Sequence, residues 1–475
     1  MLFPTTDFAI FFLIAFSIAW ALSPYPAPWK LSLLGLSYFF YGWWDPGFIL
    51  LLVAETAIAH VGARAIHRTQ DPRHRKAILI GTIVVLLGIL GYFKYAGFLT
   101  VNVDNLTRAV GLGNLLPLIQ PTLPVAISFF TFMAISYVID VYHRQLEPAT
   151  PLDLAVYLAF FPHLVAGPIV RGGELLPQIR TRRDARHIDY SRAGQLILRG
   201  MFKKVVVSSY LATHIVDPVF TSPKSHSALD AIFATWGYAA QIYCDFSGYT
   251  DIAIGLALLL GIRFPVNFDQ PYRAINLQDF WRRWHITLSR WLRDYLYIPL
   301  GGNRGSEAFV ARNIMATMIL GGLWHGANWT FLIWGALHGA GQVVGHVRRS
   351  RRVAAGIIDP PPTRWRHAWQ VFWTFQFVCL AWIFFRATSV HNAFDVIGQA
   401  FTGWGTASTL ISPLLIVTIA AVIAVQQLPA RLGDRLAAEI SNTKLWIQVG
   451  IGALALLAIT TLGPTGVAPF IYYRF

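Results

Sequence analysis

The chain has 475 residues, of which 55% are hydrophobic and only 13% are charged. Ordinary soluble proteins carry roughly 25% charged residues, and long apolar runs recur here from one end of the chain to the other. This composition excludes a soluble enzyme, a disordered chain and a disulfide-stabilised scaffold, and it predicts a polytopic membrane protein. The net charge of +15 fits the gathering of Lys and Arg in cytoplasmic loops and does not require a nucleic-acid partner.

A membrane-spanning helix needs about 20 apolar residues, and we expect an all-α polytopic membrane protein with about 11 transmembrane helices. Because the runs are continuously apolar, they do not fit the alternating pattern of a barrel. We expect one integral-membrane domain over residues 1–475. The candidate segments lie near Phe8–Leu22, Leu31–Trp44, Phe48–Val61, Ile78–Phe98, Pro121–Val141, Ala193–Ile215, Ala231–Ile262, Asn313–Val347, Trp369–Phe385, Leu410–Val425 and Leu445–Thr461.

Two local features refine this interpretation. The first run has no basic segment before it, so we interpret it as a retained helix and not as a signal peptide. The two cysteines, Cys244 and Cys379, lie in apolar surroundings and are predicted to be buried packing residues without a disulfide or zinc role.

Basic clusters orient the chain in the membrane. We expect the clusters within 64–76, 180–186 and 348–352 to lie in the cytoplasm, because cytoplasmic loops are rich in Lys and Arg. Counting spans from these loops places the C-terminal tail, Phe470–Phe475, outside the cytoplasm.

The segment Gln278–Tyr295 is predicted to form one amphipathic helix with Trp and Leu opposite its arginines. Four arginines fall within an arc of about 100° on a helical projection, and His285 lies at the border between the two faces. They are Arg282, Arg283, Arg290 and Arg293. This helix is either an anchor on anionic lipid or a docking surface for the phosphates of an anionic donor such as coenzyme A, which arginine binds in a bidentate manner.

A second segment, Gly321–Trp329, interrupts an apolar run with the sequence GGLWHGANW. The stretch Asn313–Gly322 before it is too short to span, at about 15 Å, so His325 is predicted to lie near mid-membrane. An ionisable residue at that depth is a functional candidate, and the alternative is a neutral core histidine bonded to a carbonyl.

Other polar residues in apolar runs are predicted to be structural. Asp245 and Asp251 are expected to be paired with other side chains, because an unpaired carboxylate in a membrane is costly. The broken segment Phe161–Pro168 is predicted to be re-entrant or to line a cavity, with His163 in a structural role. No nucleotide-binding, metalloprotease or acidic metal motif occurs, so we expect no metal.

These segments resemble the membrane-bound O-acyltransferase family, in its bacterial alginate O-acetyltransferase branch. The resemblance covers most of the chain. The motifs that carry it are FPHLVAGPI (Phe161–Ile169), YCDFSGYTDIAIG (Tyr243–Gly255), FWRRWHITLSRWLRDYLYIPLGGNR (Phe280–Arg304) and GGLWHGANWTFLIWGALHG (Gly321–Gly339). It implies a ring of helices around a narrow tunnel, a near-invariant histidine at His325, and the second histidine or asparagine position of the family at His285.

The resemblance also implies the reaction and its location. Family members take an acyl group from a cytoplasmic thioester, here acetyl-coenzyme A or an acyl carrier protein, and pass it outward for O-acetylation of an exopolysaccharide such as alginate. We therefore expect a bacterial inner-membrane protein with no tightly bound cofactor. Its expected partner is an extracytoplasmic esterase-like acyltransferase of the SGNH type, with a polysaccharide as final acceptor.

The C-terminal tail resembles the FIYFxF terminus of these export acyltransferases, with Tyr473 in place of Phe and Arg474 in place of the usual Gln or Glu. We hypothesise that Tyr472 carries the acyl group, because a phenol, with a pKa of about 10, is deprotonated more easily than a sugar hydroxyl. The alternative is an aromatic anchor at the membrane interface.

The sequence thus predicts an O-acyltransferase in which His325 is the general base. His285 assists it, Asn328 stabilises the oxyanion, and Trp324 with the four arginines binds the donor. Two alternatives stay open. One is a polytopic transporter or flippase without acyl chemistry, although no internal repeat is apparent. The other is a complete sugar acyltransferase that binds the glycan itself.

Overall fold

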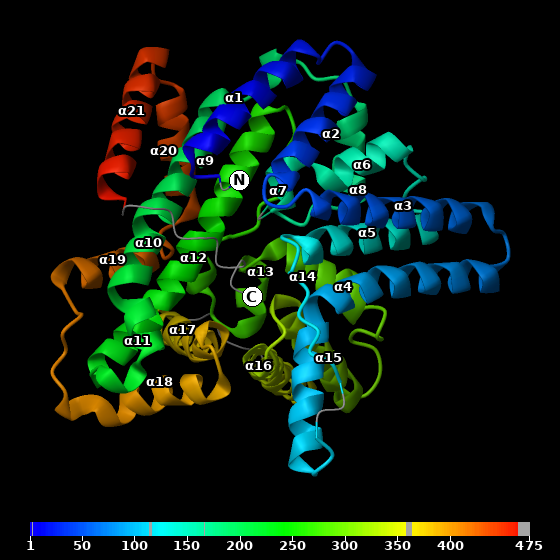
Figure 1. The fold of residues 1–475 in the computed structure, drawn as a ribbon. Helices are drawn as coiled ribbons and strands as arrows, with labels where there is room; N and C mark the ends of the chain where they lie inside the picture. Colours follow the sequence, from blue (N-terminus) through cyan, green and yellow to red (C-terminus); the bar gives the residue numbers. More distant parts are fainter. Residues whose placement is uncertain (2, 114–115, 166, 358–362, 464–475) are drawn as a thin grey trace. The chain divides into compact units, whose positions relative to one another are not determined.

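The computed structural model describes residues 1, 3–113, 116–165, 167–357 and 363–463. Within these ranges every regular element is a helix, as Figure 1 shows. The chain forms two compact units, of which the first comprises Met1–Ala193 with Ala253–Pro265 and the second Gly194–Ile252 with Val266–Phe475. That both belong to one integral-membrane domain stays a prediction.

The first unit is built from the amino-terminal helices. Its α-helices are α1 (Thr6–Ala21), α2 (Pro26–Gly42), α3 (Gly47–Arg68), α4 (Pro72–Ala109), α5 (Ile127–Tyr142), α6 (Pro151–Ala159), α7 (Phe161–Leu164) and α8 (Gly172–Arg180). Their ends follow ordinary capping rules. Thr5, Asp71 and Thr150, for example, accept hydrogen bonds from the first turns of α1, α4 and α6, as polar residues at such positions do.

The second unit contains the segments that the sequence marks as functional. It includes α10 (Ser209–Leu211), α11 (Asp217–Thr221), α13 (Leu277–Arg283), α14 (Ile286–Leu292), α15 (Glu307–His325), α16 (Trp329–Ala354), α17 (Arg364–Arg386), α18 (Val390–Thr402), α19 (Pro413–Val425), α20 (Ala430–Ser441) and α21 (Leu445–Leu462). Two helices, α9 (Tyr190–Met201) and α12 (Ala228–Leu259), have residues in both units. The π-helices Phe202–Ser208, Ala212–Val216 and Arg293–Tyr297 extend α9, α10 and α14.

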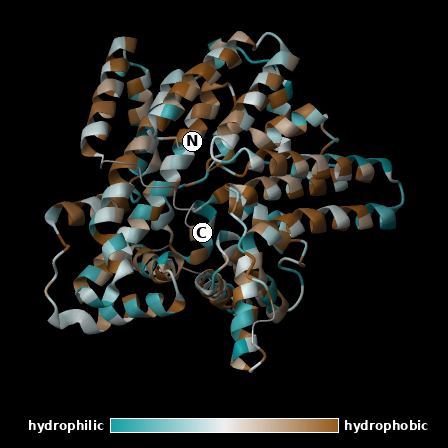
Figure 2. Cartoon of the chain, in the orientation of Figure 1, coloured by the Kyte–Doolittle hydropathy of each residue, from teal (hydrophilic) through white to brown (hydrophobic). Residues whose placement is uncertain are grey.

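Each predicted apolar segment coincides with one or more helices, but the expected number of about 11 spans is not confirmed. Among the described residues, five helices (α3, α4, α12, α17 and α21) are long and apolar enough to cross a membrane, or six if the bent pair α19 and α20 is one span. α1 and α5 are apolar but have only 16 residues each. Figure 2 shows mostly hydrophobic residues along α3 and α4 and a hydrophilic turn between them, where the basic cluster of residues 64–76 lies.

The helix that precedes His325 is longer than the sequence suggested. α15 has 19 residues and rises about 28 Å, because it begins at Glu307 and extends over residues 307–312 before the predicted segment from Asn313. The argument that a ten-residue half-helix places His325 at mid-depth is therefore wrong as to length. The interruption after His325 is present, since α15 ends there and α16 begins at Trp329.

α9 and α12 approach each other closely at a pair of glycines. A β-carbon on Gly248 would lie 2.8 Å from the carbonyl oxygen of Gly200, a distance that side chains do not tolerate. Cys244 lies one turn away on α12, and both it and Cys379 are buried free thiols, as predicted. The glycine contact fixes the spacing of two helices that share buried charges, described below.

We predict that Gly248→Ala destabilises the protein by about 1–3 kcal/mol, the usual effect of overpacking a tight contact. The matched control is Gly194→Ala on α9, where a β-carbon meets nothing within 4 Å and alanine favours the helix. Thermal unfolding of the purified protein in detergent measures both. Equal unfolding temperatures for the two variants would contradict the close approach.

Candidate functional site

His325 is the last residue of α15, and the chain enters α16 after only three more residues. α15 and α16 form the most extensive helix pair of the structure. Glycines allow this contact, because a β-carbon on Gly322 or Gly335 would collide with the backbone oxygen of Phe331 or Met318. The packing therefore carries the end of α15, and His325 with it, into the interior of the second unit, where His325 is 3% exposed.

Aromatic rings surround the His325 imidazole. The ring centroids of Trp324, Trp334 and Phe385 lie 5.0, 4.9 and 5.0 Å from that of His325. His285, which is fully buried, has its ring centroid 6.0 Å from that of Trp324. Three of the predicted site residues, His325, His285 and Trp324, are thus brought together in one apolar cluster.

The predicted helix Gln278–Tyr295 is broken at its centre. α13 ends at Arg283, α14 begins at Ile286, and His285 between them has a left-handed backbone with φ 42° and ψ 56°. A residue other than glycine in this region carries a strain of roughly 1–3 kcal/mol, which tends to occur at functional sites. The break turns the His285 ring into the interior, whereas a continuous helix would leave it at the border of two faces.

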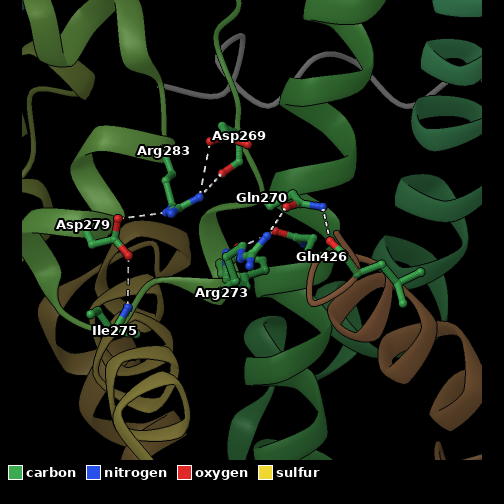
Figure 3. A network of polar contacts seen from close by, with 9 residues as sticks. Asp269, Gln270, Arg273, Ile275, Asp279, Arg283 and Gln426 are labelled. Atoms are coloured by element: carbon green, nitrogen blue, oxygen red, sulfur yellow. Dashed lines mark hydrogen bonds and ion pairs between the residues drawn. The ribbon is translucent and has the colours of Figure 1, made fainter. Parts of the chain in front are cut away.

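The four arginines do not form the predicted arc, because they lie on separate elements. Arg283 donates from Nε to Asp279 Oδ1 at 2.9 Å and from Nη1 to Asp269 Oδ2 at 3.3 Å, and Asp279 also accepts from the backbone N–H of Ile275 (Figure 3). Arg293 pairs with Asp294 at 2.6 Å. Arg282 is exposed and Arg290 is half-buried. Arg283 is therefore occupied within the protein, and Arg282 has its side chain toward the surface.

Asn328 has a structural contact at each end of its amide. Its Oδ1 accepts from the backbone N–H of Thr330 at 3.0 Å and caps α16, and its Nδ2 donates to the carbonyl oxygen of Thr388 at 3.3 Å. Such a cap contributes about 1 kcal/mol to helix stability. These contacts hold the turn after His325, and they give no support to the predicted oxyanion role of Asn328.

The prediction that Asp245 and Asp251 are paired is confirmed. Asp251 accepts two hydrogen bonds from Arg199, at 2.8 and 2.9 Å, and one from Lys203 at 2.9 Å. Asp245 forms a buried ion pair with Lys204. These three cations were not predicted as partners, although Arg199, Lys203 and Lys204 interrupt the apolar segment Ala193–Ile215 and indicate that carboxylates lie opposite them.

Two other predicted residues have different outcomes. His163 is buried in the one-turn helix α7, and its ring centroid lies 5.9 Å from that of Phe160 and 5.6 Å from that of Phe264. The helix break predicted around it is present, since α7 ends at Leu164. Tyr472 and the rest of the C-terminal tail lie outside the described residues.

The residues that build this site lie within a recognised family pattern. A model described as the membrane-bound O-acyltransferase family matches residues 125–390, a range that contains His285, Trp324, His325 and the buried ion pairs. The match therefore covers more than half of the chain and all of the site that the structure describes.

Curated relatives extend this similarity over most of the chain. A probable alginate O-acetylase of Pseudomonas putida is 38% identical over 94% of this chain and 94% of its own length. The corresponding protein of Azotobacter vinelandii is 41% identical over 85% of this chain and 78% of its own length. A peptidoglycan O-acetyltransferase of Helicobacter pylori is 38% identical over 84% of this chain and 79% of its own length.

We predict that Lys204→Met destabilises the protein by about 3–5 kcal/mol, because Asp245 is then buried without its counter-charge. The double variant Lys204→Met/Asp245→Asn removes both charges and should recover much of that loss. Arg186→Met, which removes an exposed ion pair with Asp184, is the control and should leave the free energy of unfolding unchanged. Chemical denaturation in detergent measures all three, and equal losses for the single and double variants would contradict a buried pair.

Proposed function

This chain belongs to the membrane-bound O-acyltransferase family and is an O-acyltransferase, and from that premise we propose that it exports acetyl groups for O-acetylation of a polysaccharide. The acetyl group would pass from a cytoplasmic thioester through the bacterial inner membrane. The proposal is supported by relatives named for O-acetylation of alginate and of peptidoglycan, which are both glycans. The apolar helices are those of a multi-pass membrane protein. Family membership decides against a transporter without acyl chemistry.

The observation that carries the proposed mechanism is the position of His325 at a helix end inside an aromatic cluster. In the proposed step, its imidazole accepts the proton of the attacking hydroxyl. The hydroxyl oxygen forms a bond to the thioester carbonyl carbon, and the C–S bond breaks. The proton then passes to the departing thiolate, which is a good leaving group because thiols have a pKa of about 8.5.

The rings of Trp324, Trp334 and Phe385 would serve this step by excluding water. Water beside a general base would compete with the acceptor hydroxyl for the thioester, and a closed apolar site prevents that side reaction. Trp324 lies against both histidines, so it also offers a flat apolar surface for the acyl chain. His285 would orient the donor or assist proton transfer from the other side of Trp324.

The donor is proposed to bind through cationic side chains at the surface. Of the four arginines, Arg283 is held by two carboxylates and is assigned to structure. Arg282, with Arg290 and Arg293, is proposed to receive the phosphates of coenzyme A or the phosphopantetheine of an acyl carrier protein, which a basic surface would attract.

Tyr472 is proposed as the carrier that leaves the membrane with the acetyl group. Its phenol would be deprotonated by His325 more easily than a sugar hydroxyl, and a phenyl ester remains activated enough for onward transfer. The final transfer to the glycan is proposed to belong to an extracytoplasmic SGNH-type partner. Direct glycan binding by this chain is the alternative, which continued acetylation without such a partner would favour.

We predict that transfer of labelled acetyl from acetyl-coenzyme A in proteoliposomes depends on His325 and labels the C-terminal peptide. His325→Ala should abolish transfer, and His391→Ala, which changes a largely exposed histidine, should not. Intact-mass analysis of the C-terminal peptide should show acetyl in the wild type and none in Tyr472→Phe.

The outcomes of this experiment separate the parts of the mechanism. If transfer depends on His325 but the tail carries no label, the proposed acyl transfer stands and the proposed role of Tyr472 as carrier is wrong. Full transfer by both His325→Ala and Tyr472→Phe with an active donor would overturn the catalytic assignment.

We predict opposite effects for two neighbouring arginines. Arg282→Gln should raise the KM for acetyl-coenzyme A several-fold and leave the unfolding temperature unchanged, because its side chain is exposed and contacts the donor only. Arg283→Gln should lower the unfolding temperature, because it releases Asp269 and Asp279. Steady-state kinetics and thermal unfolding of both variants test this, and an unchanged KM in Arg282→Gln would remove that residue from the donor site.

A further inference from the structure

The break at His285 is held from outside by residues 267–269. The backbone N–H of Asp269 donates to the carbonyl oxygen of Arg283 at 2.9 Å, at the end of α13. The backbone N–H of Ile286 donates to the carbonyl oxygen of Asn267 at 2.9 Å, at the start of α14. The ion pairs of Arg283 with Asp269 and Asp279 reinforce the first of these contacts (Figure 3). His285 therefore lies between two anchored ends.

The orientation of the Asn267 side chain is fixed by its partners. Oδ1 accepts hydrogen bonds from the backbone N–H of Thr287 at 3.1 Å and from Thr287 Oγ1 at 2.9 Å. Because a backbone N–H can only donate, the atom that faces it must be the amide oxygen, and the reversed amide is excluded. The amide nitrogen therefore points the other way.

This leaves polar atoms without partners beside the break. Asn267 is 1% exposed and its Nδ2 has no hydrogen-bond acceptor among the described residues. His285 is fully buried, and neither of its ring nitrogens has a hydrogen-bond partner among the residues that the structure describes. Buried polar groups are nearly always hydrogen-bonded, and an exception calls for an explanation such as a catalytic role.

The rings around the break are apolar and offer no acceptor of their own. The Phe246 ring lies 4.6 Å from that of His285, and the Phe268 ring lies 5.1 Å from Phe246 and 5.0 Å from Trp284. An amide N–H in such surroundings gains a strong hydrogen bond when an oxygen atom enters, because the local dielectric constant is low.

We propose that Asn267 binds the carbonyl oxygen of the acyl donor through its Nδ2 amide, beside His285. The proposal rests on the acyl transfer described above and adds a residue to it. When the hydroxyl oxygen bonds to the carbonyl carbon, negative charge develops on the carbonyl oxygen, and the N–H groups of Asn267 stabilise it there. As the C=O double bond re-forms and the C–S bond breaks, the negative charge passes from the oxygen to the departing sulfur, so Asn267 neither gains nor loses a proton.

A purely structural role for Asn267 makes a different prediction. As a cap, the residue needs only an acceptor for the Thr287 N–H, which aspartate and serine also supply. As a donor to the substrate, it needs Nδ2, which both substitutions remove. Asn267→Asp and Asn267→Ser therefore separate the two roles, and Asn267→Ala removes both.

The experiment measures thiol release from acetyl-coenzyme A by the full chain in proteoliposomes, together with thermal unfolding. We expect Asn267→Ser to unfold within a few degrees of the wild type, whereas Asn267→Asp, which buries a carboxylate, should lose more stability. Both variants should lose about a hundredfold or more in kcat. The KM should change less, because the bond strengthens as charge develops. A folded Asp or Ser variant that loses less than about tenfold in kcat overturns the proposal.

A second measurement does not depend on the folding of these variants. In the catalytically blocked His325→Ala protein, the infrared carbonyl stretch of bound ¹³C-acetyl-coenzyme A should lie at lower frequency than in a non-bonding solvent. An unshifted band overturns the proposal even if every Asn267 variant unfolds. Full turnover by His325→Ala would instead overturn the proposed general-base role of His325, so the two failures are distinguishable.

Discussion

The close packing of α15 against α16 is the contact on which the site depends. Gly322 and Gly335 bring each helix against the backbone of the other, so that α15 ends inside the protein and not at its surface. A histidine at the end of a helix normally finds water, whereas His325 finds the rings of Trp324, Trp334 and Phe385. The glycines in this motif thus matter for helix packing, and the apolar surroundings of His325 follow from that packing.

The polar groups that the site uses or borders include both paired and unpaired ones. Asp245 and Asp251 have cationic partners, and removing those charges from water is tolerable only because they are paired. The Oδ1 atoms of Asn328 and Asn267 accept backbone hydrogen bonds in the first turns of α16 and α14, and so they cap these helices. The ring nitrogens of His285 and the Nδ2 of Asn267 lack such partners among the residues described. These atoms lie at the left-handed break of His285, whose ring contacts Trp324.

The sequence predicted much of this, for physical reasons that are local. Continuous apolar runs gave the helices, and carboxylates within such runs indicated buried pairs, as Asp245 confirms. The break at His285 was missed, because Trp284 and His285 are neither glycine nor proline and the surrounding residues fit an amphipathic helix. That break depends on Asn267, which lies 20 residues before Thr287, and a helical projection does not include such distant acceptors.

The expected number of spans is not confirmed, for a related reason. Hydropathy alone assigns one helix to each apolar run, whereas α1 and α5 are too short for the expected length and α15 begins at Glu307, before the predicted segment from Asn313. A helix whose apolar part is shorter than the bilayer must meet other protein or water at its ends. The membrane depth of a histidine at such a helix end is therefore harder to predict from the sequence than that of a residue within a long apolar helix.

The burial of His325 also constrains how an acceptor can reach it. With 3% of its surface exposed and three aromatic rings against it, the imidazole is inaccessible to a bulky hydrated polymer. A glycan hydroxyl would have to lose its water and enter an apolar cluster, which is unfavourable for a strongly polar chain. A phenol meets neither obstacle, because its ring is apolar and only its hydroxyl must be desolvated. The apolar surroundings of His325 therefore favour a small aromatic acceptor over a glycan hydroxyl at the imidazole.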